Sequence, residues 1–157
     1  MTRDQMFAHL RAADAVAREA AAHGHHPFGA VLVSPDDRIL MRQGNIDTVR
    51  HAETELARRA FVAYGPEFLL GCTLVSTFEP CTMCAGTIYW ANIGRLVYGV
   101  TETALLALTG NHPENPTMHL PARTIFGSSQ KRACEVHGPF PELEDELIAP
   151  HRDFWRR

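Results

Sequence analysis

Hydrophobic positions recur at helical spacing near the start of the chain. Apolar residues stand three or four positions apart, with charged and polar residues between them; they are Met6, Leu10, Ala13, Ala17 and Ala20. This period matches one face of an α-helix. Thr2 and Gln5 stand in the order of a capping box, which marks the start of a helix. The pattern predicts an amphipathic helix over residues 3–22.

Shorter apolar runs predict strands. Residues 28–34 and 38–44 flank a short segment, 35–37, whose proline and aspartates favour a turn, so we expect an antiparallel hairpin. The continuous apolar run at residues 72–77 is typical of a buried strand. Two further strands are expected, at residues 95–100 and 132–136.

Helical patterns fall between these strands. They cover residues 51–64, 81–91 and 102–109. The second pattern begins just after Pro80, and the third is closed by Gly110, which are common residues at helix starts and ends. Strands that alternate with helices favour an α/β sandwich, with helices on both faces of one mixed sheet.

Residues 111–130 interrupt this alternation. They carry three prolines and no sustained hydrophobic period, which is typical of a long loop or an irregular insertion. Long loops inside compact domains often carry function, although a merely solvated connection is the alternative.

The length and composition favour one domain. A chain of 157 residues with 45% hydrophobic content can build one sizeable core, so we expect a single domain over residues 1–157. No apolar run approaches the roughly 18 residues of a membrane span, and charged residues interrupt the amino terminus, unlike a secretory signal. We therefore expect a cytoplasmic protein with no membrane partner.

The charge balance argues against long nucleic acids as partners. Fifteen Lys and Arg residues stand against eighteen Asp and Glu residues, which gives a net charge of −3 without any basic tail. Affinity for nucleic acid comes largely from neutralising phosphates. Small molecules are therefore the expected substrates.

Three residues have the spacing of metal ligands. Cys81 and Cys84 lie three positions apart at the start of a predicted helix, so both thiols can reach one ion. His51 opens another predicted helix and is the best third ligand. A structural zinc site would need a fourth protein ligand, and a redox dithiol would give His51 no role. Three ligands leave one place for water, which is typical of catalytic zinc.

Glu53 follows His51 by two positions and completes a specific pattern. His51-Ala52-Glu53 and Pro80-Cys81-Thr82-Met83-Cys84 reproduce H-x-E and P-C-x-x-C, the combined signature of zinc deaminases that act on nucleobase rings. In that chemistry zinc activates a water, and the glutamate moves protons as general base and then general acid. We therefore expect Glu53 to be catalytic, with one zinc ion on His51, Cys81 and Cys84.

The sequence resembles the nucleobase branch of the cytidine deaminase-like superfamily. The resemblance is carried by "PFGAVLV" at 27–33 and by "EPCTMCAGTIYWANIGRLVYG" at 79–99, and "IYWA" within the second is most similar to bacterial guanine deaminases. It implies a three-layer α/β/α sandwich with a mixed five-stranded sheet, one zinc per subunit and a homodimer. It also implies an aminohydrolase that acts on a small nucleobase, most simply guanine, converted to xanthine and ammonia.

The same resemblance implies roles for residues around the metal. Asn45 would hydrogen-bond the base, Phe28 would stack on it, and the Ala52 backbone would touch its edge. The carboxyl-terminal tail, about residues 141–157, would fold over an active site and place Trp155 there. The alternatives are a turn role for Asn45, a core role for Phe28, and a tail whose aromatics only anchor a terminal helix.

One departure keeps the substrate open. His112 occupies the position where guanine deaminases of this family place an acidic residue, and Glu114 is near enough to substitute for it. Cytosine or an amino-triazine is therefore an alternative substrate. A tRNA adenosine substrate is a further alternative, against which stands the acidic run at 142–146. A non-catalytic zinc-stabilised module would need a fourth ligand; the candidates are His25, His26 and His112.

Overall fold

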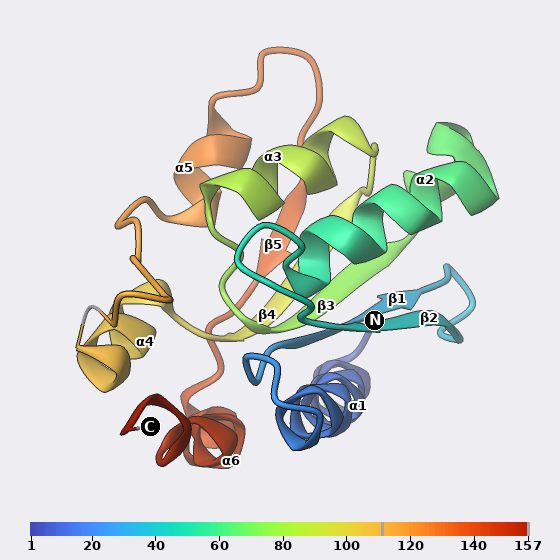
Figure 1. Cartoon of the computed structure of the whole chain (residues 1–157). Helices are drawn as coiled ribbons and strands as arrows, with labels where there is room; N and C mark the ends of the chain where they lie inside the picture. The colour runs from blue at the N-terminus through green and yellow to red at the C-terminus, as the bar shows by residue number, and fades with distance from the viewer. Residues whose placement is uncertain (111, 157) are drawn as a thin grey trace.

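A five-stranded mixed sheet divides the molecule into layers in the computed structural model, which describes residues 1–110 and 112–156 (Figure 1). The strand order is β2-β1-β3-β4-β5. β1 is antiparallel to both β2 and β3, whereas β3, β4 and β5 are parallel. The strands are β1 Gly29–Val33, β2 Ile39–Gly44, β3 Thr73–Phe78, β4 Arg95–Val100 and β5 Glu135–His137.

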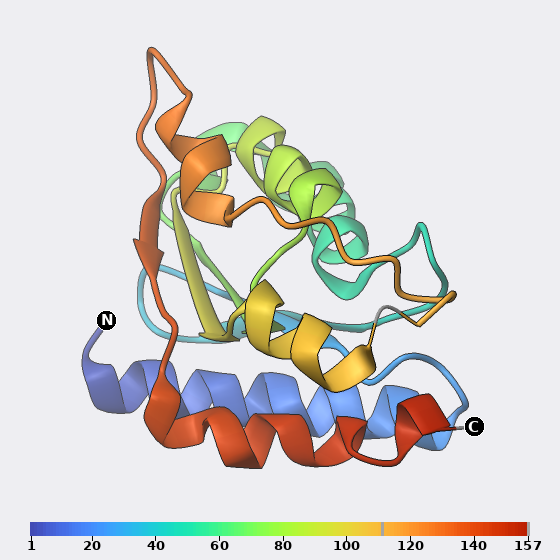
Figure 2. The same cartoon turned by 90° about the vertical axis from the view of Figure 1, so that its left-hand side faces the viewer.

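Helices cover both faces of this sheet. α2, α3 and α5 lie on one face, and α1 and α6 lie side by side on the other, with both termini on that second side (Figures 1 and 2). The predicted three-layer α/β/α sandwich is confirmed. The helices are α1 Arg3–Ala22, α2 Ala52–Leu69, α3 Thr82–Trp90, α4 Glu102–Thr109, α5 Ala122–Gly127 and α6 Pro141–Ile148, followed by the 3-10 turns η1 Ala149–His151 and η2 Phe154–Arg156.

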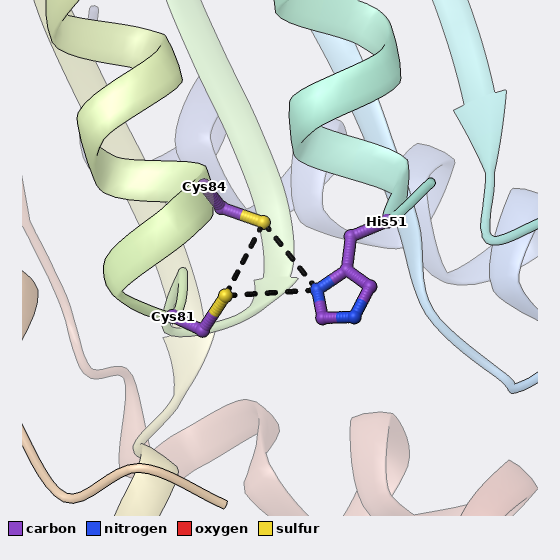
Figure 3. Close-up of side chains that lie close together, drawn as sticks. All are labelled: His51, Cys81 and Cys84. Atoms are coloured by element: carbon purple, nitrogen blue, oxygen red, sulfur yellow. Dashed lines mark hydrogen bonds between the residues drawn. The ribbon is translucent and has the colours of Figure 1, made fainter. Parts of the chain in front are cut away.

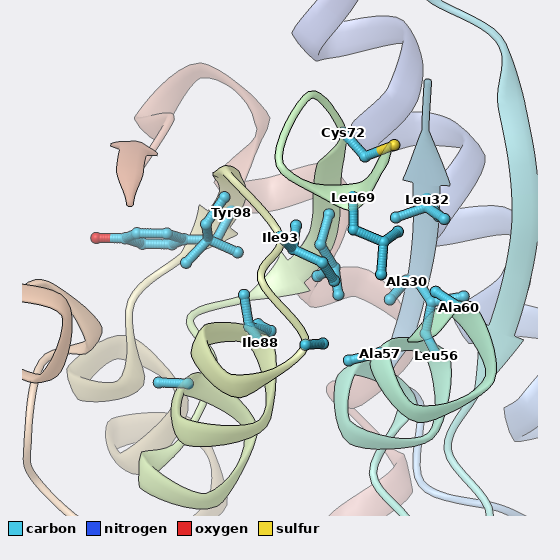
Figure 4. Close-up of a cluster of buried hydrophobic side chains, with 14 of the residues drawn as sticks. Ala30, Leu32, Leu56, Ala57, Ala60, Leu69, Cys72, Ile88, Ile93 and Tyr98 are labelled. Carbon is cyan, nitrogen blue, oxygen red and sulfur yellow. The ribbon is translucent and has the colours of Figure 1, made fainter. Parts of the chain in front are cut away.

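The central strands are buried on both faces, because successive side chains point to opposite sides of the sheet. Ala30 and Leu32 of β1 pack under α2 and α3 in the cluster shown in Figure 4. Val31 and Val33 of the same strand pack in the second cluster, which α1 and α6 cover. All five residues of β1 are buried. The β1–β3–β4 unit is therefore a rigid floor for the loops at its ends.

The expected last strand at residues 132–136 is wrong in its bounds. Strand β5 starts at Glu135, because the preceding residues turn around the end of α3. The Arg132 guanidinium donates to the carbonyl oxygens of Tyr89 at 2.6 Å and Ile93 at 3.1 Å. These bonds hold the segment against α3, so it does not join the sheet.

Two further predictions, one of a loop and one of a helix end, also differ from the structure. Residues 111–130 are not irregular throughout, since α5 forms directly after Pro121. The helix expected at residues 51–64 continues to Leu69 across a kink, where Gly65 adopts φ 75° and Pro66 restarts the helix. A glycine tolerates this left-handed backbone at low cost, and proline suits the first turn of the resumed helix.

The sheet brings two helix amino termini together. α3 follows β3, and α2 packs beside α3 on the same face. His51 is the N-cap residue of α2, and Cys81 is the N-cap residue of α3. The starts of these two helices therefore converge at one edge of the sheet. In the part of the chain that the structure describes, no helix has the length and apolar character needed to cross a membrane.

Candidate active site

His51, Cys81 and Cys84 form a close triangle of donor atoms (Figure 3). The two sulfurs are 3.6 Å apart. His51 Nδ1 lies 3.6 Å from Cys81 Sγ and 3.5 Å from Cys84 Sγ. The sequence placed these residues as ligands of one ion, and the fold brings all three together.

The triangle has the dimensions of a tetrahedral zinc site. Zinc bonds of about 2.3 Å to sulfur and about 2.0–2.1 Å to nitrogen place tetrahedral ligands about 3.5–3.8 Å apart, which matches the donor distances. The described residues add no fourth His, Cys, Asp or Glu donor to this group, and none of His25, His26 and His112 belongs to it. Three protein ligands leave one coordination position for water, which is typical of catalytic zinc.

The two cysteine thiols share a hydrogen bond that favours the thiolate of one of them, Cys81. The hydrogen bond between the two sulfurs lowers the pKa of the Cys81 thiol to about 4, with a contribution from His51, and it raises the pKa of the Cys84 thiol. Thr54 Oγ1 donates to Cys84 Sγ at 3.1 Å. A thiolate is the form that binds a metal ion, so Cys81 is ready to do so at neutral pH.

Glu53 lies beside the triangle without belonging to it. Its side chain is buried, and its Oε1 accepts a hydrogen bond of 2.6 Å from Ser76 Oγ. Its Oε2 lies 3.6 Å from Cys84 Sγ. Burial raises the pKa of this carboxyl, and the bond from Ser76 opposes that rise. A carboxyl with a raised pKa next to a metal site can exchange protons near neutral pH.

A cavity of about 440 Å³ opens over His51, Cys81 and Glu53, while the third ligand, Cys84, is buried beneath it. One wall is the segment 113–118, and the other walls come from the strand ends and from α4. No lysine or arginine occurs among the described residues that line it. They are Phe28, Asn45, Thr48, His51, Glu53, Phe78, Glu79, Cys81, Met83, Glu102, Leu105, Pro113, Glu114, Asn115, Pro116, Thr117 and Met118.

Phe28 forms part of the cavity wall and is supported from behind by the carboxyl-terminal tail. Its ring packs edge-on against Phe78 and His151, with centroids 5.6 Å and 4.9 Å away. Trp155 Nε1 donates to His151 Nδ1 at 3.1 Å. Burial lowers the pKa of His151 to about 3, so the imidazole stays neutral. Trp155 is behind Phe28 and outside the cavity lining, so the tail shapes the wall indirectly.

The other residues expected to contact the substrate differ in whether and how they line the cavity. Asn45 lines the cavity and is 3% exposed, with its Nδ2 donating to the Asp47 carbonyl oxygen at 3.1 Å. Ala52 is fully buried and does not line the cavity with its side chain. Glu114 lines the cavity, but its side chain is 64% exposed and pairs with His26 Nε2 at 3.1 Å.

Two buried carboxyls in the cavity were not predicted from the sequence. Glu79 follows β3, and Glu102 opens α4 after β4. Adjacent parallel strands end at the same edge of a sheet, where α/β proteins bind their ligands. That rule was the available signal, because both residues come directly after predicted strands.

This fold, with an ion-binding triangle at two helix starts and a buried carboxyl beside it, defines a zinc-dependent hydrolase. Residues 2–100 match the family model described as the cytidine and deoxycytidylate deaminase zinc-binding region. The chain belongs to this deaminase family, and the resemblance seen in its sequence is confirmed at the level of the superfamily. The family and the donor set together assign one zinc ion to His51, Cys81 and Cys84.

Individual relatives differ in the substrates that their names give. A Schizosaccharomyces pombe protein named as a probable cytosine deaminase is 37% identical over 95% of this chain and 91% of its own length. The tRNA-specific adenosine deaminase of Agrobacterium fabrum is 37% identical over 76% and 83%. The structure of Bacillus subtilis guanine deaminase, 29% identical, covers 95% of this chain and 94% of its own with a TM-score of 0.58.

Proposed function

We propose that this protein hydrolyses the amino group of a free nucleobase, or of a similar neutral aminated ring, and releases ammonia. The observation that carries the proposal is the position of Glu53, buried beside the three-ligand triangle at the floor of a cavity that has no lysine or arginine in its described lining. Such a site suits a small uncharged ring that presents its amino-bearing carbon to water.

Glu53 performs the proton transfers in this proposal. Zinc, when bound, lowers the pKa of a water so that hydroxide is available at neutral pH. Glu53 accepts the proton that the water loses and delivers it to the ring nitrogen beside the amino-bearing carbon, while the hydroxide adds to that carbon. It then carries the second proton of the water to the departing amino group, which leaves as ammonia while the carbonyl forms. Ser76 fixes Glu53 Oε1, so Oε2, which lies 3.6 Å from Cys84 Sγ at the metal site, is the atom that moves protons in this proposal.

The charges of the cavity favour a base over a nucleotide. Four carboxyl groups line it, and they belong to Glu53, Glu79, Glu102 and Glu114. A phosphate would meet the carboxylates that remain ionised, and it would find no lysine or arginine among the described lining residues. Deoxycytidylate is therefore a poor substrate in this proposal, and an uncharged base is a good one.

Guanine and cytosine are the two leading bases. The "IYWA" segment and the guanine deaminase structure support guanine. The S. pombe relative supports cytosine, since the match extends over 95% of the chain. An amino-triazine fits the same cavity chemistry. The tRNA adenosine alternative draws on the A. fabrum relative, whereas the acidic cavity argues against a phosphate-rich substrate.

The zinc-loaded protein should release ammonia from a free base. We would measure ammonia with guanine, cytosine, adenine, isocytosine, ammeline, their nucleosides, deoxycytidylate and a tRNA anticodon stem. We expect turnover of at least one free base, with kcat/KM at least about tenfold above that for any phosphorylated compound, because no lysine or arginine among the described lining residues would pair with a phosphate. Activity on the tRNA stem alone, or on none of the compounds, would contradict the proposal.

An exposed apolar surface on α2 and α3 supports the proposed homodimer. Five large apolar side chains outside the cavity lining are exposed on these neighbouring helices; they are Phe61, Val62, Tyr64, Phe68 and Trp90. Trp90 is 81% exposed, and such clusters mark interaction surfaces. Light scattering should report twice the chain mass for the wild type, and Trp90→Asp should shift the mass toward the monomer. A monomeric wild type would contradict a dimer through this surface.

A further inference from the structure

Glu102 is the buried group in the cavity that the proposed chemistry leaves without a role. It is the first residue of α4, with Thr101 as the N-cap residue, and it follows β4 directly. The residue is 7% exposed, and what remains accessible belongs to the cavity that it lines. Glu53 and Cys81 line the same cavity.

The Glu102 carboxyl has no hydrogen-bond or ion-pair partner among the residues that the structure describes, in contrast to the other carboxyls of the cavity. Glu53 accepts a bond from Ser76, and Glu114 pairs with His26. Because the accessible part of this carboxyl faces the cavity and no protein group bonds to it, it is available to a ligand bound there.

The surroundings favour the protonated form of Glu102. Burial and, to a smaller extent, the negative charges of Cys81, Glu53 and Glu79 together raise the pKa of its carboxyl to about 8, against an opposing contribution from His51. A protonated carboxyl carries one donor and one acceptor next to each other. This pair matches a ring N–H and its neighbouring carbonyl, the lactam edge that cytosine and guanine both present.

The backbone of Glu102 is held in place from below. Glu79 Oε2 accepts from the Glu102 backbone N–H at 3.2 Å, and Glu79 Oε1 accepts from the Ala122 N–H at 2.9 Å. One buried carboxylate therefore ties the starts of α4 and α5 to the end of β3. A side chain on so fixed a backbone can discriminate between ligands by hydrogen bonding.

We propose, building on the proposed function, that the Glu102 carboxyl hydrogen-bonds the lactam edge of the base and determines which aminated ring is accepted. Glu114 is the weaker candidate for this role, because it is exposed and already paired. Guanine deaminases of this family place an acidic residue at the position that His112 occupies here, and the sequence suggested Glu114 as its substitute. In this proposal Glu102 supplies that acidic contact instead.

The test compares Glu102→Leu with Glu102→Gln on the base that the wild type deaminates. Leucine removes both hydrogen-bonding atoms, so kcat/KM should fall about 10- to 100-fold. Glutamine keeps one donor and one acceptor, so its kcat/KM should stay within about fivefold of wild type. The wild type should reject the base methylated at its lactam nitrogen, and the leucine variant should lose most of that discrimination. Glu19→Leu, at an exposed position on α1, is the matched control and should change neither quantity.

Thermal stability separates recognition from a structural role. Because the folded pKa of Glu102 is raised from its ordinary value of 4.5 to about 8, this group lowers stability progressively as pH rises between these two values, and the loss is absent in Glu102→Leu. The midpoint of thermal unfolding of this variant should match or exceed that of wild type, with a larger gain at pH 8.5 than at pH 6. A stability–activity trade-off of this kind is typical of functional groups.

Four results would overturn the inference. Unchanged kcat/KM and discrimination in Glu102→Leu would show that the carboxyl does not contact the base. A loss of activity on all bases together with a lower unfolding midpoint would show a structural role. Equal losses in the leucine and glutamine variants would exclude the donor and acceptor pair. If the zinc-loaded wild type deaminates no base, the proposed function fails and this inference fails with it; the first three results leave the proposed function standing.

Discussion

Replacing Glu53 with glutamine is expected to lower kcat for ammonia release by about 10²- to 10⁴-fold, while about one zinc ion per chain stays bound. The glutamine side chain has the same shape and can still accept the bond from Ser76 Oγ, which is 2.6 Å long in the wild type. It cannot accept and return a proton. Zinc should stay because the three ligands are His51, Cys81 and Cys84.

Glu55→Gln provides the matched control for this prediction. Glu55 belongs to the same first turn of α2 and does not line the cavity, so its variant should retain wild-type kcat. Ammonia release and metal content would be measured on the same samples of both variants. Comparable kcat in Glu53→Gln would refute the proton-carrier role. Loss of zinc from that variant would instead show that Glu53 helps to hold the metal.

The metal site could be predicted from the sequence because its information is local. Cys81 and Cys84 share the first turn of one helix, and His51 and Glu53 share the start of another. Each pair is fixed by helix geometry alone. The only long-range contact that had to be predicted was the meeting of the two helix starts. The combined H-x-E and P-C-x-x-C signature of the deaminases implied that contact.

The main elements of the fold were also predictable, because their hydrophobic periods are regular. The capping box of Thr2 and Gln5 and the left-handed Gly110 after α4 are present as expected. The errors fall where a tertiary contact decides the outcome. Arg132 holds its segment against the end of α3, so β5 begins later than its apolar run indicates.

The substrate contacts could not be derived in the same way. Glu79 and Glu102 enter the cavity because β3 and β4 are neighbours in the sheet. The order of the strands in the sheet cannot be predicted from the sequence of either strand alone. Trp155 hydrogen-bonds to His151 and packs against Phe28 with ring centroids 6.3 Å apart, so it contacts a residue of the cavity wall. Both facts depend on how distant segments pack, which spacing within one segment does not report.

Cys84→Ala is expected to abolish zinc binding and ammonia release, and to remove the stabilisation that zinc gives the fold. Cys84 is fully buried, its Sγ is 3.6 Å from that of Cys81, and it accepts a bond from Thr54. Two remaining ligands hold zinc poorly compared with three. Metal that binds only the folded state stabilises it by about 4 kcal/mol at a thousandfold excess over its dissociation constant.

Cys72→Ala is the matched control, since Cys72 is equally buried and lies outside the ligand set. Thermal unfolding with and without a chelator separates the two effects of the mutation. Chelation should lower the unfolding midpoint of the wild type and of Cys72→Ala, and it should leave that of Cys84→Ala unchanged. Since removing either thiol leaves a similar small void, any chelator-sensitive difference between the two variants belongs to the metal. A Cys84→Ala protein that kept one zinc and wild-type turnover would show that the ion is held elsewhere, and the deaminase mechanism would lose its starting point.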